Sequence, residues 1–91
     1  MTLTTKFKQG LKGQAHKLKP VVMVGNHGVT PAVIKEVDRA LNDHTLIKIR
    51  ISVADREEKR AAFAEICDAC EAEAVQLIGN IGVIYRKPTE E

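Results

Sequence analysis

One segment in the first half of the chain has a pattern that few folds accommodate. Residues 21–24 are an apolar run that predicts a short strand in the interior of a sheet, and a Gly-x-x-Gly motif at residues 25–28 follows it directly. Thr30-Pro31 is typical of a helix start. Residues 45–53 then alternate between apolar and polar side chains, as in a half-buried strand. Because a helix between two strands usually forms a crossover, we expect a parallel pair of strands.

Amphipathic patterns on both sides of this unit predict two further helices. Residues 3–18 repeat apolar side chains at helical spacing. We expect this helix to end at Lys19-Pro20, because the residue before a proline disfavours the helical conformation. A later helix is expected from an N-cap at Asp55 to about Glu73, with Ala74 at the end of its apolar stripe.

The last part of the chain predicts two strands. Residues 75–78 and 83–86 are short apolar runs, and residues 79–82, Gly-Asn-Ile-Gly, predict the turn of a hairpin between them. The complete order is an N-terminal helix followed by βαβαββ. The predicted fold class is therefore α/β, with a four-stranded mixed sheet and packed helices.

The length of 91 residues fits one domain, because so short a chain cannot bury two cores. We therefore expect residues 1–91 to form a single domain with a frayed tail at residues 88–91. No apolar stretch approaches the roughly 18 residues of a membrane span, and the lysine-rich N-terminus lacks the apolar centre of a signal peptide. We expect a cytoplasmic monomer that does not contact a membrane.

Positive charge is concentrated at the start of the chain. The net charge is only +2, but the first nineteen residues contain five lysines and no acidic residue. Such a segment is typical of proteins that contact polyanions, although a solvated helix face has the same composition.

The Gly-x-x-Gly motif offers an anion a place to bind. A turn between a strand and a helix N-terminus presents backbone N–H groups and the positive end of the helix dipole. The alternative is a turn that uses glycine only for its dihedral angles and binds nothing. If the ligand is phosphate, the contacting loop residues are Gly25, Asn26, His27 and Gly28, the attracting lysines are Lys8, Lys12, Lys17 and Lys19, and Lys48 and Arg50 are secondary contacts provided that the outer face of their strand is open.

Other chemistries find little support in the sequence. Cys67 and Cys70 form a CxxC motif, but zinc needs four ligands and no second pair is present. Both cysteines fall on the apolar stripe of the predicted third helix, so we expect buried thiols. The acidic residues fall at helix caps or on solvent faces, away from any nucleophile, and we expect no enzymatic activity, metal or cofactor.

The few aromatic residues limit the kind of nucleic-acid contact. Only Phe7, Phe63 and Tyr85 are aromatic, and both phenylalanines fall on apolar helix stripes. Readers of single-stranded RNA stack bases on exposed aromatic side chains. We therefore expect recognition of backbone and shape in folded RNA.

Four parts of the chain closely resemble the CRM domain, the chloroplast RNA splicing and ribosome maturation module: residues 18–30, 46–49 and 75–79 and Tyr85-Arg86. The resemblance covers essentially the whole chain, whose length is that of the stand-alone bacterial members, the YhbY type. It implies a fold similar to the C-terminal domain of translation initiation factor three, no catalysis, and binding to ribosomal RNA in precursors of the large ribosomal subunit. It also implies that residues 25–28 and nearby basic residues contact RNA.

Two rival classes share some of these features. A KH-like module would use a GxxG loop on single-stranded nucleic acid, although its loop joins two helices. A protein-interaction adaptor would use the acidic third helix instead of the loop. We predict an RNA-binding assembly factor that grips the backbone of structured ribosomal RNA.

Overall fold

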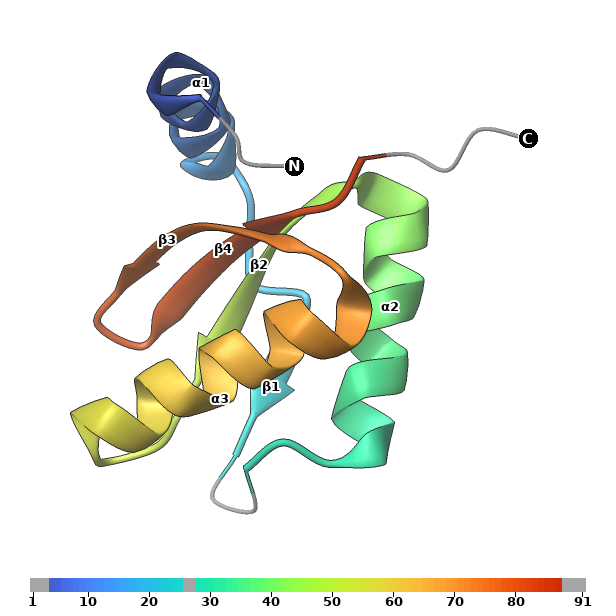
Figure 1. Cartoon of the computed structure of the whole chain (residues 1–91), viewed down its shortest axis with the longest axis vertical. Coiled ribbons are helices and arrows are strands. Elements are labelled where there is room, and N and C mark those ends of the chain that lie inside the picture. Colours follow the sequence, from blue (N-terminus) through green and yellow to red (C-terminus); the bar gives the residue numbers. More distant parts are fainter. Residues whose placement is uncertain (1–3, 26–27, 88–91) are drawn as a thin grey trace.

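The computed structural model describes residues 4–25 and 28–87, which form an α/β architecture (Figure 1). The predictions that fall on Asn26, His27 and residues 88–91 lie outside the described residues. The predicted element order is confirmed. The helices are α1 (Thr5–Ala15), α2 (Pro31–His44) and α3 (Arg56–Cys70), and the strands are β1 (Val22–Val24), β2 (Leu46–Ile51), β3 (Glu73–Ile78) and β4 (Ile81–Tyr85).

The four strands form one mixed sheet in the order β1-β2-β4-β3. β1 and β2 are parallel, as the intervening helix predicts, whereas β4 pairs antiparallel with both β2 and β3. The hairpin therefore joins the sheet through its second strand, which places β4 in the interior beside β2.

The two faces of the sheet are covered to different extents. On one face, α2 and α3 pack over the apolar side chains of β2 and its neighbours, and this cluster contains the most deeply buried residues. On the other face, Leu11 and Ala15 of α1 pack against Leu46, Val75 and Val83. Because α1 packs on Leu46, Val75 and Val83, this second face is open farther along β2, at Arg50, and at Met23 of β1.

Side-chain caps begin each helix. Thr4 Oγ1 accepts a hydrogen bond from the Phe7 N–H at 3.1 Å, and Thr30 Oγ1 accepts one from the Val33 N–H at 3.2 Å. Asp55 Oδ1 accepts the N–H groups of the first turn of α3. These caps satisfy donors that have no partner within the helix, and the predicted starts of α2 at Thr30 and α3 at Asp55 are confirmed.

The ends of α1 and α3 were predicted too late. α1 ends at Ala15 instead of Lys19, because a closing turn follows in which the Leu18 N–H donates to the Ala15 carbonyl at 3.0 Å. α3 ends at Cys70 because Glu71 adopts the left-handed conformation, with φ of 53°. Ala74, expected on the helix stripe, is part of β3 instead.

β1 is an edge strand, so the prediction of an interior strand was wrong. It pairs only with β2, and the Met23 side chain is 63% exposed on the face that α1 leaves open. Val22 and Val24 are buried on the opposite face, as the apolar run predicts.

The hairpin turn is shorter than predicted. Only Gly79 and Asn80 separate β3 from β4, and Gly79 has the left-handed φ of 57° that favours glycine. Gly82, predicted to be part of the turn, lies inside β4, where an added Cβ would come within 2.6 Å of Phe63 Cε1. The absence of a side chain at Gly82 is therefore what lets Phe63 pack against the sheet.

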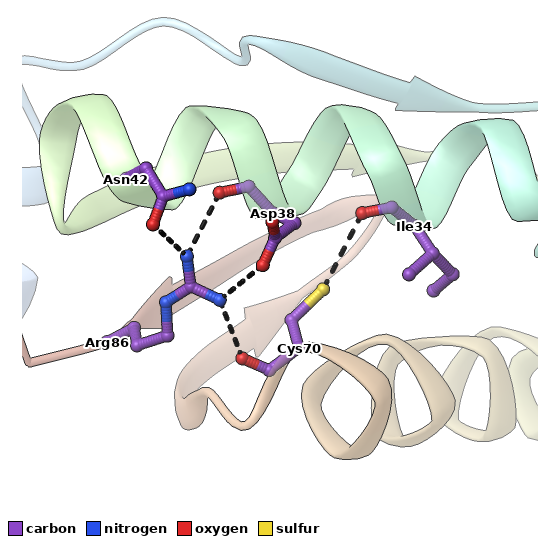
Figure 2. A network of polar contacts seen from close by, with 5 residues as sticks. All are labelled: Ile34, Asp38, Asn42, Cys70 and Arg86. Carbon is purple, nitrogen blue, oxygen red and sulfur yellow. Dashed lines mark hydrogen bonds and ion pairs between the residues drawn. The ribbon is translucent and has the colours of Figure 1, made fainter. Parts of the chain in front are cut away.

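Arg86, just after β4, links α2 and α3 by hydrogen bonds to both helices (Figure 2). Its guanidinium donates to Asp38 Oδ1 at 2.7 Å, to Asn42 Oδ1 at 2.7 Å and to the Cys70 carbonyl at 2.9 Å.

Within residues 4–25 and 28–87, none of the helices has the length and apolar character needed to cross a bilayer.

Candidate functional site

The loop between β1 and α2 is closed by its own backbone. The Gly28 N–H donates to the Gly25 carbonyl at 3.0 Å, and Gly28 has a φ of +73°. The positive φ explains why glycine is found at position 28. The hydrogen bond to Gly25 means that the Gly28 amide is already bonded within the loop.

The first turn of α2 offers few amides to an anion. Thr30 accepts hydrogen bonds from the N–H groups of Val33 and Ile34, and Pro31 has no N–H. In the described part of this turn, the Ala32 N–H is the one without an acceptor. The helix dipole still favours an anion here, but among the described residues the first turn of α2 leaves few amides free to bind one.

Glycine makes the backbone of this loop accessible. A Cβ added at Gly25 or Gly28 would have no atom within 4 Å. The strand that leads into the loop places Met23 beside Arg50 in the parallel register of β1 and β2. A basic side chain of β2 therefore lies next to the strand end from which the loop emerges.

The outer face of β2 is open at Arg50 and partly covered at Lys48. Arg50 is exposed, whereas Lys48 is partly buried. Both face the side on which α1 packs, because Ile47, Ile49 and Ile51 point into the opposite core. Lys48 and Arg50 were predicted to be secondary contacts provided that this outer face is open. The face is open at Arg50 and only partly open at Lys48.

Three of the predicted lysines gather around Lys48. A groove of about 810 Å³ between α1 and β2 is lined by Lys17, Lys19 and Lys48. A second groove of about 250 Å³, on the β3 side of α1, is lined by Lys12, His16 and again Lys48. We call the set Lys12, Lys17, Lys19, Lys48 and Arg50 the basic track.

Lys8 and the glycine loop are not next to these grooves. Lys8 is partly buried and lines neither of the two. Figure 1 shows α1 at the opposite end of the long axis from the end of β1 and the start of α2, which flank the loop. The lysines near α1 and the loop are therefore joined only through the outer face of β2.

Sequence reasoning missed the apolar side chains on this open face. Met23 and Ile78 are 63% and 64% exposed, and Phe7 is 44% exposed although the sequence places it on the apolar stripe of the first helix. The Phe7 ring instead meets Tyr85 edge to face, with centroids 5.5 Å apart. An apolar run does not reveal which of its residues lies at a sheet edge, so the sequence carried no signal for these positions.

The two cysteines are buried, as predicted, in the core between α2 and α3. Burial raises the pKa of Cys67 to about 11 and also raises the pKa of Cys70. Both thiols are therefore protonated near neutral pH. Within the described residues, no three His, Cys, Asp or Glu side chains are grouped so that they could hold a metal ion.

Comparison with known proteins bears on this site. A model of the CRS1 / YhbY (CRM) domain matches residues 3–86. The chain belongs to this family. It is 51% identical over 90 residues to a Haemophilus influenzae protein named as an RNA-binding protein, covering 99% of this chain and 90% of the relative.

Two further relatives of this CRM protein agree. It is 42% identical over 87 residues to a Pseudomonas aeruginosa protein named "Probable RNA-binding protein", covering 96% of this chain and 84% of the relative. The solution structure of a Staphylococcus aureus protein, which is itself described as a candidate RNA-binding protein, superposes on this chain with a TM-score of 0.86 at 32% identity. That match covers 98% of this chain and 93% of the other.

Proposed function

We propose that this CRM protein binds RNA through the open face of its sheet and the loop between β1 and α2. The observation that carries the proposal is the basic track, which runs from the end of α1 along β2 to the strand end beside the loop. Family membership and the names of the relatives support RNA as the polyanion.

The basic track and the loop have different roles in this proposal. The track attracts phosphates by charge, and this attraction dominates protein–nucleic acid affinity. The loop lets the backbone approach closely, because neither Gly25 nor Gly28 carries a side chain and the space around both is open. With the Gly28 amide bonded to Gly25, the loop contributes close fit more than a set of free donors.

We further propose that the RNA is structured ribosomal RNA in precursors of the large ribosomal subunit, and that the protein acts as a monomeric assembly factor without catalysis. The resemblance to the stand-alone CRM proteins supports this substrate. The aromatic rings support backbone recognition, since Phe63 is buried and Phe7 packs against Tyr85.

Crosslinking of the full-length protein to RNA in living cells, with mapping of both crosslinked nucleotides and crosslinked peptides, tests the proposal. We expect nucleotides of large-subunit ribosomal RNA precursors, and peptides that contain residues 17–30 and 46–51. Crosslinks spread evenly over messenger RNA would contradict the ribosomal assignment. Crosslinked peptides confined to α3 would contradict the binding surface.

A further inference from the structure

The groove of about 810 Å³ between α1 and β2 combines an apolar floor with a basic rim. Leu18, Val21 and Leu46 contribute the apolar surface, and the rim is formed by lysines of the basic track. In the part of the chain that the structure describes, no aspartate or glutamate lines this groove. A ligand that fits must therefore present both an apolar face and a negative charge.

Gly10 and Gly13 line the groove on α1, together with Gln14. Each glycine inside a helix is about 1 kcal/mol less favourable than alanine. A Cβ added at Gly10 or Gly13 would have no neighbour within 4 Å, so close packing within the molecule does not account for either residue. Their effect is that much of the helix surface facing the groove is bare backbone, with Gln14 as the α1 side chain beside it.

We propose that this groove binds one unpaired nucleobase of the RNA, with an adjacent phosphate held by the lysines of the rim. The inference rests on the proposed function. A planar base can lie against bare helix backbone and above aliphatic residues, as unstacked bases of folded RNA do in protein pockets. The volume is within the usual range of about 300–1,000 Å³ for small-ligand sites.

Polar groups at the groove allow a base edge to be held. Gln14, His44 and Thr45 line it together with the lysines. An amide, an imidazole and a hydroxyl can donate to or accept from the edge of a base. A nucleotide thus uses the apolar floor, the polar side chains and the positive rim, whereas inorganic phosphate uses only the rim.

Titration of the full-length, ¹⁵N-labelled protein tests this inference with four probes: adenosine 5′-monophosphate, uridine 5′-monophosphate, ribose 5-phosphate and inorganic phosphate. We expect saturable shifts of the Gly10, Gly13 and Leu46 amide signals with the nucleotides, and binding of ribose 5-phosphate that is about fivefold to tenfold weaker. Equal affinity for all four probes would overturn the inference, because charge alone would then explain binding. Nucleotide-induced shifts elsewhere would overturn it as well.

The substitution Gly10→Leu fills the groove, and Gln9→Leu is the matched control on the same helix outside the groove. Leucine favours helix more than glycine, so Gly10→Leu should fold at least as well as the original protein. We expect nucleotide affinity to fall about fivefold or more in Gly10→Leu and to stay unchanged in Gln9→Leu. Unchanged affinity in folded Gly10→Leu would overturn the inference.

RNA crosslinking separates the two proposals. A protein that crosslinks to RNA through the basic track but shows no nucleotide signals in the groove would overturn the base-binding inference and leave the proposed function intact. A protein that binds neither RNA nor nucleotides would overturn both.

Discussion

Arg86 and Asp38 join the end of the sheet to α2 through an ion pair of 2.7 Å between Nη1 and Oδ1 (Figure 2). The Arg86 Nη2 also donates to the Asp38 carbonyl at 3.0 Å. Only 17% of the Arg86 side chain is exposed, whereas 53% of Asp38 is. Arg86 was one of the residues on which the CRM resemblance rested, and its contacts assign it to the packing of α2 and α3.

Replacing Arg86 with lysine is expected to lower the free energy of unfolding by about 1–3 kcal/mol. The reason is geometric, because one ammonium group cannot reach the four acceptors that the planar guanidinium serves. Urea unfolding would measure the change. Lys87→Ala, at the exposed neighbouring position, is the control and should shift the stability by less than about 0.5 kcal/mol. Equal unfolding midpoints for Arg86→Lys and the original protein would contradict this role.

Replacing Gly82 with alanine is expected to destabilise the protein by about 1–3 kcal/mol. The new methyl group would lie 2.6 Å from Phe63 Cε1 and 3.3 Å from Ile49 Cγ1, so the core must shift. The control is Gly13→Ala, which meets no atom within 4 Å and should stabilise α1 by up to about 1 kcal/mol. Thermal unfolding followed by circular dichroism measures both. If Gly82→Ala unfolds at the same temperature as Gly13→Ala, Phe63 does not pack against Gly82 as described.

Gly82 also shows where sequence reasoning reaches its limit. Local signals predicted well what depends on near neighbours in the chain: the N-cap at Thr30, the alternation of β2 and the order of elements were all confirmed. Two glycines of the hairpin look alike in sequence, yet Gly79 supplies a positive φ and Gly82 makes room for Phe63, a residue from another element. Only the packing of α3 on the sheet distinguishes them.

The candidate site was predictable in part for the same reason. The glycine loop and the lysines could be found as local motifs. Their relationship could not, because it depends on β1 lying at the edge, where Met23 pairs with Arg50, and on how much of β2 is covered by α1. The internal bond between Gly28 and Gly25 likewise depends on loop geometry that the motif does not specify.

The raised pKa of Cys67 predicts that stability falls at alkaline pH. Burial raises the pKa from 9.0 to about 11, so the folded protein holds this proton more tightly than the unfolded chain does. The contribution to stability is therefore fully present below pH 9.0 and is lost as the pH rises toward 11. Free energies of unfolding measured across this window should decline less steeply for Cys67→Ala. Parallel curves would show that Cys67 does not contribute.

The basic track predicts how RNA affinity depends on salt. Substituting both Lys17 and Lys19 with alanine should reduce the slope of log affinity against log salt by up to roughly 1.8, because each lost phosphate contact removes about 0.7–0.9. Arg60→Ala, on the exposed side of α3, is the control and should leave the slope unchanged. Lys8→Ala should change it less than either lysine of the groove. Filter-binding measurements over a range of salt concentrations check this, and an unaltered slope in the double variant would remove these lysines from the interface.

The glycine loop is best tested at Gly25. Gly28 has a positive φ, so a substitution there would strain the backbone as well as alter the contact, whereas Gly25 has open space and no such constraint. Gly25→Asp places a carboxylate where RNA phosphate should approach, and Gly25→Ser adds a shorter polar side chain without charge. We expect Gly25→Asp to weaken RNA binding about tenfold or more, and Gly25→Ser to weaken it much less, with both variants folded. The comparison separates repulsion from crowding: equal losses in the two variants would mean that the loop acts through close fit alone, and no loss in either would mean that RNA does not touch it.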